Sequence, residues 1–434
     1  MKMQSIHVYA VQPNGDFALE SPAPNAGEGT GTGNPYTSVD VITFLTQRLP
    51  RSLPVLRLLQ LSPRNPGTLV ITTPLPLQGP VEGAKGEADP ATVRPEHVWT
   101  MLVVDRSSHP ATEIWPFSSL EMYHGAASHE QGPQKAAVLP ASLKDSLPFS
   151  EAVLRVATAQ LLSVASHIPV TWRDTTGTQS PAERLANVRH TPGSPYCLFG
   201  NTHSTVAALL ARADSDSESS GSGSPLILNP SVPYGKYVFP VPAPSNKQQE
   251  GSRNEEEDNN ARQEGSSATL LPEGLVWSTI GPDDYADVMA VNKIIRSATT
   301  LAKLRSAAIR EAAPRPEGKP GKAVAFAFAA GDGSVRTLHV DPAYRRRGLA
   351  KMVVARLLGM GLFEPPRSGP LATKEEDLLA RKEGDHGDIT LAFAGIEESN
   401  TGSIRTFQAL GGKWLWDVYW IYLDLDRARE LVQG

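Results

Sequence analysis

The chain has 434 residues and a formal net charge of −5 at pH 7. This length favours two domains with connecting segments, and the acidic balance gives no support to a nucleic-acid partner, which would favour a basic face. The single cysteine, Cys197, excludes an internal disulfide and a cysteine-rich metal site, and it fits a reducing compartment.

The N-terminus lacks the apolar run of a signal peptide. No stretch of the sequence approaches the roughly 18 consecutive apolar residues of a membrane-spanning helix. We therefore expect a protein without a membrane partner, located in the cytoplasm, with a nuclear location left open.

Residues 1–244 predict an N-terminal lobe of α/β or α+β type. Apolar residues at helical spacing indicate helices, and runs rich in Val, Ile, Trp and Phe indicate strands. Helices are expected at 38–52, 148–168 and 202–212, strands at 67–73, 97–105, 111–121 and 195–201, and a separate apolar element at 53–61. The strands 97–105 and 111–121 are expected to pair with each other.

Two segments, residues 213–224 and 245–268, are polar, Ser-rich and acidic. They have too little apolar surface to offset the entropy of ordering, so the sequence predicts disorder in both. Residues 224–242 lie between them and have enough apolar and aromatic side chains to dock as an extended segment. We interpret residues 245–268 as a linker to a C-terminal domain at residues 269–434.

The C-terminal domain predicts the order strand, helices, strand, strand, helix, strand, helix, strand. Strands are expected at 274–280, 323–329, 335–341, 388–396 and 414–426, and helices at 282–310, 349–360 and after Asn400. Residues 323–329 alternate Ala with Val or Phe, as in a strand. A GDGS turn at 331–334 is expected to join this strand to residues 335–341 as an antiparallel hairpin.

The stretch at residues 335–360 has the outline of an anion site. A strand and a turn lead through Arg345, Arg346, Arg347 and Gly348 into an amphipathic helix. A helix N-terminus has backbone N–H groups without partners and about half a positive charge, so it suits a phosphate or pyrophosphate. The glycine permits close approach of a ligand to the backbone, and the arginines add cationic donors.

This strand, its P-x-x-R-x-x-G-x-A turn and the helix resemble the GNAT superfamily of acyl-CoA N-acyltransferases. The family fingerprint is Gln or Arg, two residues, Gly, one residue, then Gly or Ala, which here runs from Arg345 to Ala350. A second block, NTGSIRTFQALGG at 400–412, is similar to the second motif of the family. The match covers residues 270–427 and looks closest to the glycine N-acyltransferase-like branch and its fungal relatives.

The resemblance implies an α/β (α+β) fold, with a GNAT-like mixed sheet flanked by helices in the C-terminal domain. The N-terminal lobe is expected to be a degenerate copy of that fold, because residues 49–61 and 113–121 resemble the same branch.

The resemblance also implies an acyl-CoA co-substrate, expected to be acetyl-CoA, an amine acceptor of unknown identity and no metal. The backbone of residues 338–340 would pair with the pantetheine arm, and the amides of residues 346–351 would hold the pyrophosphate. The residues implied in acyl-CoA binding are Leu338, His339, Val340, Arg345, Arg346, Arg347, Gly348, Leu349, Ala350, Lys351, Asn400 and Ser403.

In the same comparison, three positions that usually carry an acid or a base in the family carry other residues in this sequence. Ser334 stands where glycine N-acyltransferases have a base glutamate, and Gly395 stands at another frequent carboxylate position. Phe407 replaces a tyrosine that often protonates the departing thiolate. Glu397 is the best substitute base, because side chains two residues apart on a strand share a face. His339, whose imidazole titrates near neutral pH, is an alternative base, and a bound water is a third.

The leading hypothesis is therefore an acyl-CoA-dependent N-acyltransferase, expected to be an N-acetyltransferase, that acts on the amine of a small molecule or an amino acid. The alternative is a catalytically weak acyl-CoA-binding or regulatory pseudo-acetyltransferase. Both predict CoA binding, so turnover separates them.

Overall fold

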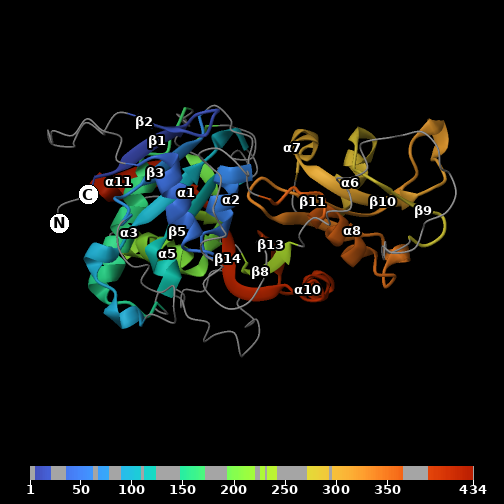
Figure 1. Ribbon diagram of the computed structural model, residues 1–434. Coiled ribbons are helices and arrows are strands. Elements are labelled where there is room, and N and C mark those ends of the chain that lie inside the picture. The colour runs from blue at the N-terminus through green and yellow to red at the C-terminus, as the bar shows by residue number, and fades with distance from the viewer. Residues whose placement is uncertain are drawn as a thin grey trace.

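A computed structural model describes residues 5–20, 36–61, 67–77, 89–108, 112–123, 147–171, 193–219, 225–229, 232–241, 271–292, 296–364 and 390–433. Two β-sheets and the helices that cover them make up these residues (Figure 1). The predicted mixed α/β fold is confirmed.

The larger sheet combines strands from both ends of the chain. Its strands are β1 (His7–Val11), β2 (Phe17–Glu20), β3 (Leu69–Thr72), β4 (Thr100–Val104), β5 (Ile114–Ser118), β6 (Tyr196–His203), β7 (Ile227–Asn229), β8 (Tyr234–Val241), β13 (Thr390–Glu397) and β14 (Lys413–Asp424). Their order is β13-β8-β14-β6-β5-β4-β3-β1-β2, with β7 beside β14. The strands β5 and β6 run parallel, and the other neighbours are antiparallel.

Helices cover both faces of this sheet. The helices α1 (Ser38–Thr46) and α2 (Leu53–Leu61) lie on one face, and α3 (Glu151–Ser166), α5 (Ser204–Ser219) and α11 (Leu425–Gln433) lie on the other. Along β4, Met101 and Val103 pack on the side of α1 and α2, and Leu102 and Val104 pack on the side of α3, α5 and α11. A strand buried on both faces is apolar throughout, which is why its pattern does not alternate. The predicted pairing of this strand with residues 111–121 is confirmed as β4–β5.

The smaller sheet is antiparallel, in the order β12-β11-β10-β9. Its strands are β9 (Leu275–Ser278), β10 (Arg305–Glu311), β11 (Ala323–Ala329) and β12 (Val335–Val340). The helix α8 (Leu349–Leu358) covers one face, and α6 (Tyr285–Val291) and α7 (Ala298–Lys303) cover the other (Figure 1). Ala325 and Ala327 of β11 face α8, while Phe326 and Phe328 face α6 and α7. The predicted β11–β12 hairpin is confirmed.

The helical prediction for residues 282–310 is wrong at its end. Residues from Arg305 onward form β10, which lies between β9 and β11. Ala307, Ala308 and Ile309 are fully buried there. A short apolar run buried on both faces cannot be told from a buried helix by its periodicity, so the tertiary pairing decided this element. Residues 425–433 were also missed: β14 ends at Asp424 and α11 follows.

Two findings bear on the predicted domain boundaries. The strands β13 and β14 come from the predicted C-terminal domain, yet they lie in the larger sheet beside β8 and β6. The division at residues 244 and 269 therefore stays a prediction, and β13 and β14 lie on the N-terminal side of it in the fold. The predicted linker 245–268 lies outside the described residues. The helix α5 continues through Ser219, so the prediction of disorder is wrong for residues 213–219. Residues 220–224 lie outside the described part of the chain.

Candidate functional site

The candidate site lies where the two sheets meet and then part. Ser334, at the start of β12, forms a parallel bridge with Phe393 of β13, and the Phe393 N–H donates to the carbonyl of Gly333 at 3.3 Å. Beyond this bridge the strands diverge, and a cavity of about 1840 Å³ opens between them. In the described chain β12 is the last strand of its sheet. One edge of its backbone therefore faces this cavity, where its polar groups can pair with a bound molecule.

The backbone of β12 is irregular beside the cavity. The register with β11 shifts between Phe326 and Phe328, and Thr337 has a φ of 54°. A positive φ is unusual for a β-branched residue and marks strain that the surrounding fold must hold in place. The residues that follow, 338–340, line the cavity. The carbonyl of Val340 already accepts a hydrogen bond from Arg345 Nε at 3.1 Å.

The turn before α8 is open to a ligand. Gly348 is the N-cap residue of α8, with a φ of 77°, and a Cβ built there would meet no heavy atom within 4 Å. The N–H groups of the first helical turn, at residues 349–351, have no acceptor earlier in the helix. An anionic group can therefore approach both the backbone and the positive end of the helix, and the loop fits a pyrophosphate.

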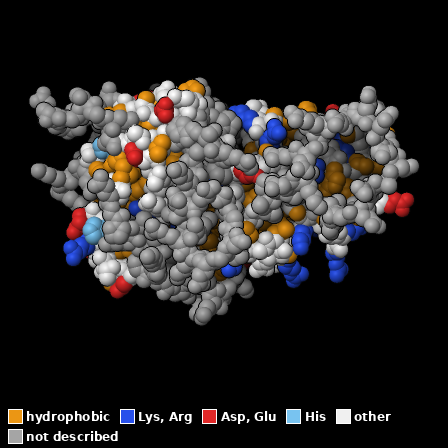
Figure 2. Space-filling view, viewed as in Figure 1, with side chains coloured by type: hydrophobic (Ala, Val, Ile, Leu, Met, Phe, Trp, Pro, Cys, Tyr) orange, Lys and Arg blue, Asp and Glu red, His pale blue; other side chains and the backbone are white. Residues whose placement is uncertain are grey.

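The cationic side chains of this loop divide into two groups. Arg345, Arg346 and Lys351 line the cavity and are exposed. Arg347, which was predicted with them, does not line it. Its guanidinium lies over the ring of Tyr344 at 5.1 Å and donates to the carbonyl of Ala343 at 3.3 Å. Figure 2 shows several Lys and Arg side chains on the lower side of the half that contains the smaller sheet.

Asn400 and Ser403 lie together on the opposite wall. Asn400 is the N-cap residue of α10 (Thr401–Gln408), and its Oδ1 accepts a hydrogen bond from the Ser403 N–H at 3.2 Å. Both residues line the cavity. Since the side-chain oxygen caps the helix, the Nδ2 group of Asn400 is the part that can donate to a ligand.

Three positions where an acid or base was expected are occupied by other structure. Ser334 is buried, and its Oγ donates to Asp332 Oδ1 at 2.5 Å. A Cβ at Gly395 would lie 2.9 Å from Cη2 of Trp420, so the indole ring fills that space. Phe407 is buried against Phe239, with ring centroids 5.2 Å apart.

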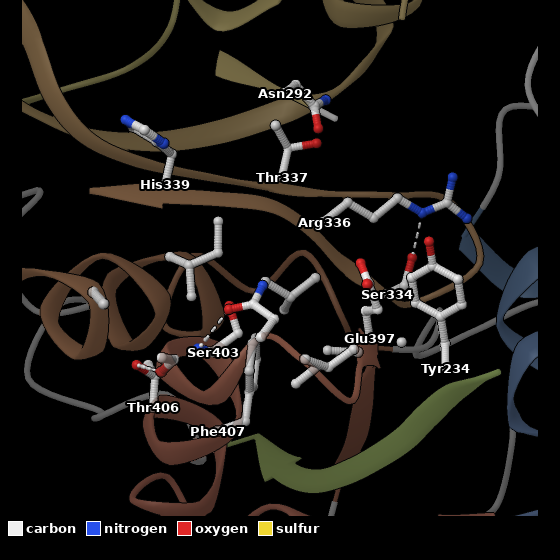
Figure 3. A pocket seen from close by; sticks show the side chains of 18 of the residues that line it. Tyr234, Asn292, Ser334, Arg336, Thr337, His339, Glu397, Ser403, Thr406 and Phe407 are labelled. Atoms are coloured by element: carbon white, nitrogen blue, oxygen red, sulfur yellow. Dashed lines mark hydrogen bonds between the residues drawn. The ribbon is translucent and has the colours of Figure 1, made fainter. Parts of the chain in front are cut away.

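The two predicted base candidates face different sides of β12. Glu397 lines the cavity at the end of β13 and accepts a hydrogen bond from Ser399 Oγ at 2.8 Å. His339 also lines the cavity, but its ring stacks on Phe326, which packs with α6 and α7. Figure 3 shows this ring pointing away from Glu397. Burial, and then the charge of Arg345, lower the pKa of His339, so its imidazole is neutral at pH 7. Both catalytic roles stay predictions.

A buried polar network that was not predicted lies at the inner end of the cavity. Asp332 is 1% exposed and accepts hydrogen bonds from Asn201 Nδ2 at 3.0 Å and from Trp115 Nε1 at 3.4 Å. It also pairs with Arg336, which donates to Ser334 Oγ at 2.6 Å. Burial alone would raise the pKa of Asp332, but the charge of Arg336 and the Ser334 hydrogen bonds outweigh it, so the carboxyl is ionised.

Lys236 extends this network to β8. Its Nζ donates to Asn201 Oδ1 at 2.7 Å and lies 3.4 Å from the ring centroid of Phe393. Burial holds the pKa of this lysine well below its usual value. The network joins residues from β6, β8 and the β11–β12 turn, which are far apart in sequence. A lysine inside the apolar run YGKYVF was the one local indication of it.

The acid Glu121, 4% exposed, lies near Lys236 and provides a test of this buried environment. Burial raises its pKa to about 8, against the hydrogen bond from the Ser118 N–H. The unfolded chain ionises near the usual 4.5, so the free energy of unfolding falls as pH rises from there to about 8. Glu121→Gln is expected to remove this loss and to raise the free energy of unfolding by about 4 kcal/mol at pH 8, with little effect at pH 4. Urea unfolding across pH 4–9 measures it, and parallel pH profiles for both proteins would contradict it.

No helix in the described residues has the length and apolar character needed to cross a membrane. Within the same residues, no group of His, Cys, Asp and Glu side chains is arranged to hold a metal ion.

Comparisons with known proteins found a match between part of this chain and a family model. Residues 31–237 match the family model of the acyl-CoA N-acyltransferase verG N-terminal domain. No curated protein sequence matches the chain.

Similar solved structures include an X-ray structure of a Drosophila protein, which is 13% identical, covers 90% of this chain and 97% of its own, and has a TM-score of 0.40. A GCN5-related N-acetyltransferase from Kribbella flavida is 16% identical, with a TM-score of 0.25, over 44% of this chain and 58% of its own. An acetyltransferase of the GNAT family from Novosphingobium aromaticivorans is 14% identical, with a TM-score of 0.24, over 44% and 65%. The last two matches span less than two thirds of those proteins.

The family model matches residues 31–237 of 434, which is less than half of the chain. The GNAT-like motifs predicted from the sequence lie outside the matched residues, after residue 334. The glycine N-acyltransferase-like branch stays a prediction.

Proposed function

We propose that the chain transfers an acyl group from acyl-CoA, with acetyl-CoA as the preferred donor, to the amine of an amino acid. The observation that carries the proposal is the cavity between β12 and β13, which has an anion-binding helix N-terminus at one end and the carboxylate of Glu397 on its wall. The family match to residues 31–237 supports the same class.

The co-substrate would lie along the free edge of β12. The N–H groups of residues 349–351 and the side chains of Arg345 and Arg346 would hold the pyrophosphate, and the backbone of residues 338–340 would pair with the pantetheine arm. Acyl-CoA supplies the activated thioester carbonyl. A backbone N–H on the cavity edge of β12 would stabilise the negative charge that develops on the carbonyl oxygen.

A second cationic group at the inner end of the cavity favours an acceptor with a carboxylate. Arg296 and Arg336 line the cavity there. Arg336 comes four residues before Val340 on β12, a separation of about 13 Å at about 3.3 Å per residue of strand. Among the described residues, only Thr337 Oγ1 accepts a hydrogen bond from Arg296, at 3.0 Å. Burial, and then the charge of Arg336, lower the pKa of Arg296 to about 10, so it is still charged at pH 7.

The described lining contains arginine and lysine at positions 296, 336, 345, 346, 351 and 405, against the single carboxylate of Glu397. An acceptor with one carboxylate and one amine complements this arrangement. Its carboxylate would bind Arg296, and its amine would lie near Glu397, which would take the amine proton.

Turnover tests the proposal directly. Release of free CoA from acetyl-CoA is measured across amino acids and matched amines that lack the carboxylate, together with acetyl-CoA affinity by calorimetry. Activity with amino acids over the matched amines supports the proposal. Tight binding without CoA release from any acceptor would favour a binding module, and no binding of acetyl-CoA would refute the class.

Glu397→Gln tests the proposed base. We expect kcat to fall about 100-fold near neutral pH, because a positioned base contributes about that much, while acetyl-CoA affinity changes less than about twofold. Glu398→Gln is the matched control, since Glu398 is the next residue and does not line the cavity. Full activity of the Glu397 variant would remove this residue as the base.

A further inference from the structure

Tyr234 lies across from Glu397 at the cavity. It begins β8, and its Cα is the register partner of Glu397 on β13. Directly opposed residues of an antiparallel pair have their side chains on the same face, so the phenol and the carboxylate project together. Figure 3 shows both side chains pointing toward β12 and Ser334. The ring of Tyr234 is held edge-on against Trp420, with centroids 4.7 Å apart.

The Tyr234 hydroxyl is available to a ligand. None of the described residues forms a hydrogen bond with it, although the side chain is half-buried and lines the cavity. The other cavity tyrosines differ: Tyr344 donates to Glu311 Oε1 at 2.6 Å, and Tyr422 also has an interaction partner. A partly buried hydroxyl normally has a partner, so this one is poised to form a hydrogen bond with a substrate.

The environment keeps the proton on this phenol. Burial, and then the charge of Glu397, raise the pKa of Tyr234 above its ordinary value. At neutral pH the group is therefore a proton donor. Phe407, at the position where a tyrosine acid was expected, is buried in the core and has no hydroxyl.

We propose that Tyr234 is the general acid that protonates the departing thiolate. This inference rests on the proposed acyltransferase function. The amine nitrogen forms a bond to the thioester carbonyl carbon and loses one proton to Glu397. The carbon–sulfur bond then breaks, its electron pair goes to sulfur, and sulfur takes the proton of the Tyr234 hydroxyl. Glu397 returns its proton to the phenolate across the strand pair, so the products are the amide and neutral CoA thiol, with both side chains restored.

Tyr234→Phe in the full chain tests the assignment. We expect kcat to fall on the order of 100-fold, with acetyl-CoA affinity by calorimetry changed less than about twofold, because only the proton donor is removed. Tyr237→Phe is the matched control, since it removes a hydroxyl from a tyrosine of the same strand that does not line the cavity, and it should leave kcat within about twofold.

A pH profile distinguishes an acid from a packing role. Wild-type kcat should decline on the alkaline side as the phenol ionises, and incorporation of 3-fluorotyrosine at position 234, which lowers the phenol pKa, should move that decline to lower pH. An unmoved alkaline limb, or full kcat in Tyr234→Phe, would overturn the inference while the wild type still releases CoA. If the wild type neither binds acetyl-CoA nor releases CoA, the proposed function fails and this inference fails with it.

Discussion

Replacing Gly348 with aspartate is expected to weaken acetyl-CoA binding about 100-fold, or about 2.7 kcal/mol. The open space in front of Gly348 is where the pyrophosphate is proposed to lie, and a carboxylate there would occupy that space and repel the phosphates. Isothermal titration with acetyl-CoA measures the change. Part of the loss should disappear at high salt, because salt screens the repulsion between exposed charges.

Gly348→Asn is the matched control for this variant. Asparagine has nearly the same size as aspartate, lacks its charge and tolerates the positive φ of 77° at this position. We expect it to weaken binding by about tenfold at most, so the difference between the two variants isolates charge. Wild-type affinity in the aspartate variant would exclude the turn before α8 as the phosphate site.

Asp332→Asn is expected to lower the free energy of unfolding by about 3–5 kcal/mol, the range for breaking a buried ion pair. Asp332 Oδ2 accepts from Asn201 and pairs with Arg336. An amide would present a donor to these donors or leave the arginine charge without its partner. Urea unfolding followed by far-UV circular dichroism measures the loss as an earlier midpoint.

Asp341→Asn supplies the comparison at the other end of β12. Asp341 pairs with Lys322 Nζ at 2.6 Å, but the lysine side chain is 50% exposed. Exposed pairs contribute little, so this variant should cost less than about 1 kcal/mol. Equal midpoint shifts in the two variants would show that the network around Asp332 does not stabilise the junction of the sheets.

The local patterns of the C-terminal half predicted most of its elements. Helix α8 begins at Leu349 as expected, because its apolar positions share one face and Gly348 supplies the left-handed turn before it. The strand β11 followed from strict alternation between Ala and larger apolar side chains. The two faces of β11 pack against different cores, with small side chains on one face and large ones on the other. The alternation is therefore visible in the sequence.

The prediction failed where burial removed periodicity. The strand β10 lies in the middle of the smaller sheet with both faces covered, so its apolar run did not distinguish strand from helix. The strand β8 was predicted only as an extended segment that docks, yet it pairs with both β13 and β14. Its importance depends on partners more than a hundred residues away in the chain.

The sequence by itself determined the turn of residues 345–351, which is proposed to bind the phosphates, because its geometry is local: a strand end, a left-handed glycine and a helix N-terminus lie within one short stretch. Only the tertiary structure decided what surrounds it. The register of β8 with β13 places Tyr234 opposite Glu397, and the packing of Trp420 fills the space beside Gly395. Pairing of distant strands sets these contacts, and no local propensity encodes which residues will face each other.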